Sequence, residues 1–172
     1  MKSRSVRDML PKALPSIWRF ALSLTGDIEM THDLAQSTCL RAVEKADQFQ
    51  EAGSFEGWCL RICRSIWLNE LRSRARRQDK AFATVDIDQV AAIAPEIEQN
   101  VFAREIVAKV MSLPDAQRSA VELVFVQQFT YSEAAIILDV PIGTIMSRLH
   151  AARKVLRDFA ESPAAGNRKE KT

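Results

Sequence analysis

The chain contains few of the residues that accompany strand-rich folds. Only five of its 172 residues are glycine, and aromatic residues make up 7% of the total. Hydrophobic residues nevertheless account for 47%, which is enough for packed cores. This balance favours an all-helical protein over a sheet-rich one, and the length allows one domain or two small ones.

Long apolar runs are also missing. No stretch approaches the length of a membrane span, and the N-terminus lacks the apolar core and cleavage site of an export signal. Three cysteines, an odd number, fit a reducing compartment. We therefore predict a cytoplasmic protein without membrane insertion.

Residues suited to catalysis are scarce. His32 and His150 stand in unrelated contexts, and no nucleophile–base pair accompanies either. Cys59 and Cys63 lie four residues apart on a predicted helix, as a metal or redox pair can. No histidine or third cysteine lies nearby in the sequence, so two buried, small apolar side chains are the favoured interpretation. We predict a protein that is not an enzyme, with no metal site, cofactor or small-molecule substrate.

The net charge is only +2, but the basic residues are unevenly distributed along the chain. Residues 1–80 hold 14 basic and 10 acidic side chains, residues 81–112 hold 2 and 5, and the remainder holds 8 and 7. Basic charge therefore collects in two places separated by an acidic stretch.

Helical patterns divide the chain into two small helical domains joined by a flexible linker. The first half is predicted to contain helices over residues 14–24, 29–49 and 55–77, the last with Ser54 as its N-cap. The second half is predicted to contain helices over 96–111, 115–129 and 131–138, followed by one more that begins near 141. The predicted boundaries are 1–80 and 96–162 for the domains, 81–95 for an acidic linker and 163–172 for a disordered tail.

A helix-turn-helix is predicted near the C-terminal end of the second domain. Thr130-Tyr131-Ser132-Glu133 forms a capping box, which opens a short helix that runs to Leu138. Asp139-Val140 makes a tight turn, and Pro141 stands where a new helix can start.

The last helix has two different faces. Its apolar stripe consists of Ile145, Leu149, Ala152 and Leu156. Its other surface presents Thr144, Met146, Ser147, Arg148, His150, Ala151, Arg153 and Lys154. From Pro141 through Arg157 there are four basic residues and no acid, a charge that suits the major groove of DNA. An ordinary helical hairpin with a solvated charged face is the alternative.

The long helix of the first half carries a second candidate surface. Aromatic and cationic residues alternate along it at Trp58, Arg61, Arg64, Trp67 and Arg72, and it ends in an arginine-rich run. Such a surface can hold phosphates and stack on unpaired bases. Alternatively, both tryptophans are core residues and the arginines are a solvated helix end. The second basic helix beyond the acidic linker favours the nucleic-acid interpretation.

Five stretches of the chain follow one another in a known order and spacing. They are Phe20 to Asp27, Asp33 to Ala42, Phe55 to Arg64, Ser112-Leu113-Pro114, and the Pro-x-Gly-Thr-x-x-Ser-Arg-Leu run that begins at Pro141. On these stretches the chain, from about Leu14 to Leu156, resembles the extracytoplasmic-function (ECF) sigma factors, two-domain bacterial transcription initiation factors. Each stretch is moderately specific, whereas their shared order and spacing are highly specific.

The resemblance implies that the chain binds core RNA polymerase and directs promoter-specific initiation. Contacts to the clamp coiled coil of the polymerase β′ subunit are implied for Asp33, Gln36, Ser37, Leu40 and Arg41. Recognition and melting of the −10 element are implied for Gly53, Ser54, Trp58, Arg61, Arg64, Ser65, Asn69 and Arg72. The β flap and an anti-sigma factor are further implied partners.

The second domain is implied to bind the −35 element. Met146, Ser147, His150 and Ala151 would face base edges, with Thr144 beside them, while Arg148, Arg153 and Lys154 would lie nearer phosphates. Many relatives have lysine or arginine at position 146 and arginine at 151. Methionine and alanine cannot donate hydrogen bonds from their side chains, so we expect this chain to read its −35 bases more through van der Waals contact.

Two rival functions differ in class. A helix-turn-helix regulator would act without polymerase contact, and a decoy with this fold would only sequester an inhibitor. A simple regulator binds its operator alone, usually as a symmetric dimer. The basic helix of the first half and the acidic linker argue against that mode of action.

Overall fold

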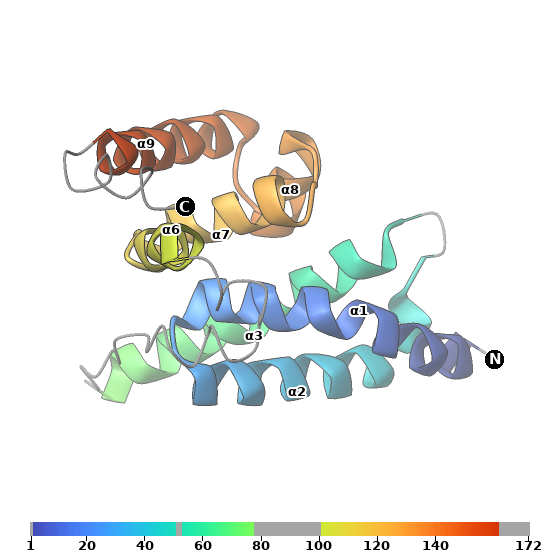
Figure 1. Ribbon diagram of the computed structural model, residues 1–172. Coiled ribbons are helices and arrows are strands. Elements are labelled where there is room, and N and C mark those ends of the chain that lie inside the picture. Colours follow the sequence, from blue (N-terminus) through green and yellow to red (C-terminus); the bar gives the residue numbers. More distant parts are fainter. Residues whose placement is uncertain (1, 51–52, 78–100, 162–172) are drawn as a thin grey trace.

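Helices form every regular element that the structure describes, which confirms the all-α prediction. The computed structural model describes residues 2–50, 53–77 and 101–161. One half contains α1 (Lys2–Thr25), α2 (Ile28–Glu44), the short 3₁₀-helix η1 (Ala46–Gln48) and α3 (Phe55–Arg77). The other half, above it in Figure 1, contains α6 (Val101–Met111), α7 (Asp115–Val121), the π-helical turn η2 (Glu122–Val126), α8 (Tyr131–Leu138) and α9 (Ile142–Ala160). The predicted linker 81–95 and tail 163–172 lie outside the described residues.

The first half is a three-helix unit in which α1 packs against both α2 and α3. Ile17 and Phe20 of α1 and Leu60 of α3 are completely buried at its centre. Ser54 caps α3, because its hydroxyl accepts a hydrogen bond from the Gly57 amide at 3.1 Å, as predicted. Packing of these apolar side chains fixes the positions of α2 and α3 relative to α1, and therefore the positions of the outer surfaces of both helices.

Cys59 and Cys63 belong to this core, as expected for small apolar side chains. Both are 0% exposed, and they carry no disulfide. Among the described residues, no group of three or more potential ligands is placed to hold a metal ion.

The cysteines should therefore differ in reactivity. Burial raises the pKa of Cys59 and of Cys63 to about 12, so both remain thiols at neutral pH. Burial also raises the pKa of Cys39, but this side chain is only partly buried and remains accessible. Because the thiolate is the reactive form, iodoacetamide should modify Cys39 first in the native protein, and all three cysteines only in denaturant. Mass spectrometry of the alkylated protein measures this. Rapid native labelling of Cys63 would contradict it.

Two helices of the first half differ from their predicted lengths. Helix α1 begins at Lys2 rather than near residue 14, although Pro11 and Pro15 each remove a helical hydrogen bond. Burial of Val6 and Ala13, each 1% exposed, holds this extension against the core. Helix α2 ends at Glu44 rather than at Phe49, because the chain turns there to place Phe49 against the ring of Phe55, with 5.2 Å between centroids.

In the second half α9 packs against α7 and α8. Leu123, Ile145 and Leu149 are completely buried between these elements. The helix predicted over 115–129 is interrupted, because the backbone widens into the π-helical turn η2 and then reaches Gln128 with a left-handed φ of 60°. The Thr130–Glu133 capping box is present, with both reciprocal hydrogen bonds formed.

No single helix among residues 2–50, 53–77 and 101–161 is both long and apolar enough to cross a membrane, and only the bent pair α8–α9 meets the criterion, by length and composition.

Candidate nucleic-acid interface

Helices α8 and α9 form the predicted helix-turn-helix. They are bent by 104° relative to each other, and Asp139 makes the turn in the left-handed conformation, with φ of 46°. The amide of Val140 closes the turn on the Ala135 carbonyl at 3.0 Å. Pro141 precedes the first residue of α9 with φ of −58°, an angle that suits a helix start.

The outer face of α9 is open over most of its predicted contacts. Ile145, Leu149 and Ala152 are fully buried, which confirms three members of the predicted stripe, while Leu156 is partly buried. The exposed predicted contacts are Met146, Ser147, His150, Arg153 and Lys154, and those of intermediate exposure are Thr144, Arg148 and Ala151. The face therefore combines an apolar thioether, hydroxyl and imidazole groups, and cations.

Two of these side chains are held by their own domain. The Ser147 hydroxyl donates to the Thr144 carbonyl at 3.0 Å, so it is oriented by its own helix. The Arg153 guanidinium donates to the Tyr131 hydroxyl at 2.9 Å and lies 5.1 Å from the centroid of the Phe125 ring. Arg153 is thereby fixed near the N-terminal end of α8, at the edge of the outer face of α9.

Helix α3 supplies a second basic surface. Arg61, Ser65, Asn69 and Arg72 are exposed, and the Arg72 guanidinium donates to the Asn69 side-chain oxygen at 3.0 Å. The two tryptophans separate in role: Trp67 is 4% exposed and belongs to the core, whereas Trp58 is only partly buried.

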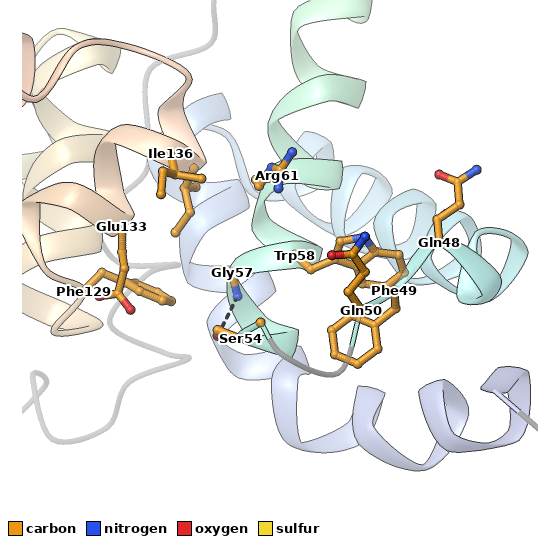
Figure 2. A pocket seen from close by; sticks show the side chains of 12 residues that line it. Gln48, Phe49, Gln50, Ser54, Gly57, Trp58, Arg61, Phe129, Glu133 and Ile136 are labelled. Carbon is orange, nitrogen blue, oxygen red and sulfur yellow. Dashed lines mark hydrogen bonds between the residues drawn. The ribbon is translucent and has the colours of Figure 1, made fainter.

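A cavity of about 620 Å³ lies beside Trp58. Gly53, Ser54 and Arg61 line it together with Phe49, a residue that the sequence did not single out. Figure 2 shows Phe49, Ser54 and Arg61 on one side of it and Phe129, Glu133 and Ile136 on the other. Phe49 packs on Trp58 with 5.3 Å between ring centroids, so an aromatic wall borders the cavity.

A second cavity, of about 380 Å³, continues along α3. Arg61, Arg64, Ser65 and Arg72 line it on the α3 side. Of the eight residues predicted to contact the −10 element, only Asn69 lies beside neither cavity. Residues 51 and 52, which directly precede Gly53 and Ser54, lie outside the described part of the chain.

The outward face of α2 presents a third set of predicted contacts. Asp33, Gln36, Ser37, Leu40 and Arg41 are all exposed, and Leu40 is 62% exposed. The opposite face of the helix buries Leu34, Ala35 and Ala42 against the core. Leu40 is thus the one apolar side chain among these five exposed residues.

Two protein-family models match the chain, one over each of the two halves of the fold. The family model described as Sigma-70 region 2 matches residues 11–77, and the one described as Sigma-70, region 4, matches residues 103–156.

Whole-chain relatives are similar over both regions. The ECF RNA polymerase sigma factor EcfG of Rhodopseudomonas palustris is 34% identical over 88% of this chain and 83% of its own length. SigW of Bacillus subtilis, also an ECF RNA polymerase sigma factor, is 26% identical over 82% of this chain and 81% of its own.

Solved structures share the fold. The sigma factor RpoE of Bartonella quintana, in complex with the anti-sigma factor NepR, superposes with a TM-score of 0.72 at 25% identity. That superposition covers 93% of this chain and 99% of the other. CnrH, in complex with the cytosolic domain of CnrY, superposes with a TM-score of 0.62 at 19% identity, a likeness of fold.

Proposed function

The chain belongs to the ECF sigma factors of RNA polymerase, and we propose that its two halves divide promoter recognition between α3 and α9. As a member of this family it is a non-catalytic initiation subunit that binds polymerase and promoter DNA. The observation that supports the division is the presence of two separate basic faces, one on each half. We assign residues 1–80 to polymerase and −10 binding, and residues 96–162 to −35 binding.

The −10 element should bind along α3. Melting a duplex costs the free energy of base pairing and stacking. Stacking on the protein and contacts to phosphates must offset that cost. Trp58 stands at the wall of the larger cavity, and Arg61, Arg64 and Arg72 follow it along the helix. Gly53 and Ser54 precede these residues at the start of α3, where a flipped base would enter. A sequence-reading pocket followed by a basic track suits one displaced strand.

The −35 element should bind along α9. Met146 and Ala151 offer van der Waals surface, Ser147 and His150 offer hydrogen bonds, and the surrounding cations offer phosphate contacts. Arg148, Arg153 and Lys154 are the cations that we assign to phosphates, and we place Thr144 at the entrance of the helix into the groove.

Polymerase should bind mainly through α2. We propose that Leu40 enters an apolar contact with the β′ clamp coiled coil, with Asp33, Gln36, Ser37 and Arg41 around it as a polar rim. The second half would meet the β flap. We further propose a cytoplasmic location and control by an anti-sigma factor. One structural relative, RpoE, is in complex with an anti-sigma factor, and the other, CnrH, is in complex with the cytosolic domain of CnrY.

Initiation should depend on core polymerase. With core enzyme and a promoter fragment library, the purified chain should give transcripts from one promoter class. Core enzyme without the chain should give no transcripts from these promoters. Because its promoter contacts are divided between two halves, the isolated chain should bind duplex DNA weakly at physiological salt. Leu40→Ala should reduce initiation by lowering affinity for core enzyme, measured by fluorescence anisotropy, whereas Lys12→Ala, an exposed change on α1, should not. Tight, sequence-specific duplex binding by the isolated chain would instead indicate a regulator that acts without polymerase.

A further inference from the structure

The two cavities beside α3 adjoin each other, since Arg61, Ile136 and Ile137 line both of them. Helix α3 provides one wall, and α8, which contacts α3, provides the wall opposite. The two cavities together form what we call the α3–α8 compartment. Their volumes, about 620 and 380 Å³, are typical of sites for small molecules. The compartment therefore has the size to hold a small ligand between residues of both halves.

The smaller cavity carries an excess of positive charge. Arg61, Arg64 and Arg72 line it, together with one carboxylate, that of Asp139. In the part of the chain that the structure describes, Arg61 and Arg64 take part in no ion pair and donate no hydrogen bond, and Arg72 donates to the neutral side chain of Asn69. The guanidinium groups are therefore available to a ligand that carries several negative charges, such as a polyphosphate.

Arg64 shows most clearly that an anion would be stabilised in the smaller cavity. The side chain is half-buried, and burial is the main cause that lowers its pKa. The charge of Asp139 raises this pKa, whereas the neighbouring charges of Arg148 and Arg72 lower it further. A phosphate placed here would be attracted by all of these cations and would offset the cost of partly burying the Arg64 charge.

The larger cavity suits a planar ring. Phe49 and Trp58 border it, with 5.3 Å between their ring centroids, and Phe129 lies on the side opposite (Figure 2). Gln48 and Gln50 line the same cavity, and each carries an amide group that can both donate and accept hydrogen bonds. Nucleobases bind to proteins by stacking on aromatic rings and by hydrogen bonds along their edges, and a purine offers the larger stacking surface.

We propose that the α3–α8 compartment is a binding site for a purine nucleoside di- or triphosphate, with the base in the larger cavity and the phosphates in the smaller one. Seven of the eight residues assigned to the −10 element line the compartment, so the nucleotide and the −10 strand exclude each other. This exclusion rests on the proposed function, whereas the nucleotide site does not. Ile136, Ile137 and Asp139 of α8 belong to the nucleotide site alone.

Calorimetric titration of the full chain with GTP and with ATP, at physiological salt, tests the site. Guanosine, adenosine and inorganic tripolyphosphate are titrated alongside as the separate parts of the ligand. We expect at least one of the two nucleotides to bind. Its nucleoside and tripolyphosphate should each bind at least about tenfold more weakly, because each fills only one of the two cavities.

Two substitutions, one in each half, locate the bound nucleotide. Arg64→Gln removes a cation from the smaller cavity, and Ile136→Glu adds a carboxylate at a residue that is 62% exposed and lines both cavities. Each should weaken nucleotide binding at least about tenfold. Arg76→Gln and Ile142→Glu are the matched controls, since they make the same changes at exposed residues that line neither cavity. Both controls should bind as the wild type does, and thermal melts establish that every variant is folded.

Asp139→Asn should act in the opposite direction. It removes the one carboxylate of the smaller cavity, so nucleotide affinity should rise by about threefold to tenfold. Asp139 has a left-handed φ of 46°, a conformation that asparagine also adopts readily, so the turn should keep its shape. A residue that served only to shape the turn would give unchanged or weaker binding in this variant.

Three results would overturn the nucleotide site. They are absence of binding by both GTP and ATP at about 1 mM, tripolyphosphate that binds as tightly as the nucleotides, and wild-type affinity in Ile136→Glu. The second result would indicate a basic surface without a base pocket. None of these titrations contains polymerase or promoter DNA. Failure to initiate with core enzyme therefore refutes the proposed function alone, and failure to bind nucleotide refutes this inference alone.

Discussion

Leu149→Asp should unfold the C-terminal half and abolish initiation. Leu149 is 0% exposed between α9 and the elements beneath it. Loss of the leucine contacts alone costs about 2–5 kcal/mol, and the aspartate adds the cost of burying an unpaired carboxylate. The total reaches the roughly 5 kcal/mol at the low end of stability for a small domain, so the half should not remain folded. Circular dichroism should show partial loss of helix, and limited proteolysis should remove residues 101–161 while α1–α3 persist.

Two substitutions separate unfolding from loss of DNA contact. Leu149→Met conserves volume and should cost less than about 1.5 kcal/mol, with initiation retained. Met146→Asp makes a similar charge change on the same helix at a residue that is 50% exposed, so it should leave the melt unchanged and weaken only promoter binding. A protease-resistant C-terminal half in the Leu149→Asp protein would show that α9 does not carry the core of this half.

Local signals in the sequence predicted the helix-turn-helix well. The Thr130–Glu133 capping box and the spacing of Ile145, Leu149 and Ala152 depend only on neighbouring residues, and the structure confirms both. The same holds for the Ser54 cap of α3. Caps and amphipathic stripes are formed by residues close together in the chain, so they can be recognised without knowledge of tertiary packing.

Tertiary contacts account for what the sequence did not reveal. The extension of α1 through Pro11 depends on burial of Val6, which local propensity cannot indicate. Arg118 has the outward appearance of a surface arginine three residues after Asp115, yet it is buried because it reaches a carbonyl 95 residues away. Phe49 was missed for the same reason, since its aromatic partners Phe55 and Trp58 belong to the next helix.

The two tryptophans of α3 illustrate the limit for the candidate site. The spacing of the two residues in the sequence was equally compatible with burial in the core and with contact to DNA. Trp67 is buried with Arg74 stacked over its ring at 5.9 Å, whereas Trp58 borders a cavity. Only the packing of α1 and α2 against α3 decides which turn of the helix faces outward, so the choice between them required the structure.

Ser147→Ala and His150→Ala should change which −35 sequences are read, with little effect on folding. Both residues are exposed, so each substitution should alter stability by no more than about 0.5 kcal/mol. If either side chain makes a good base contact, discrimination at one −35 position should fall by about 1–3 kcal/mol, or roughly 5- to 150-fold in relative initiation. Initiation from a set of −35 variants measures this, with thermal melts alongside.

Arg153→Ala should behave differently, since a phosphate contact carries no base information. Binding should weaken on all −35 variants alike, and the salt slope of holoenzyme binding should fall by about one. Arg153 also donates to the Tyr131 hydroxyl, so Tyr131→Phe is the control that removes this bond and keeps the cation. A uniform loss with Arg153→Ala but not with Tyr131→Phe assigns the effect to the charge. If the whole −35 preference survives both Ser147→Ala and His150→Ala, the outer face of α9 does not read bases through these two side chains. The −35 preference must then come from the van der Waals contacts of Met146 and Ala151.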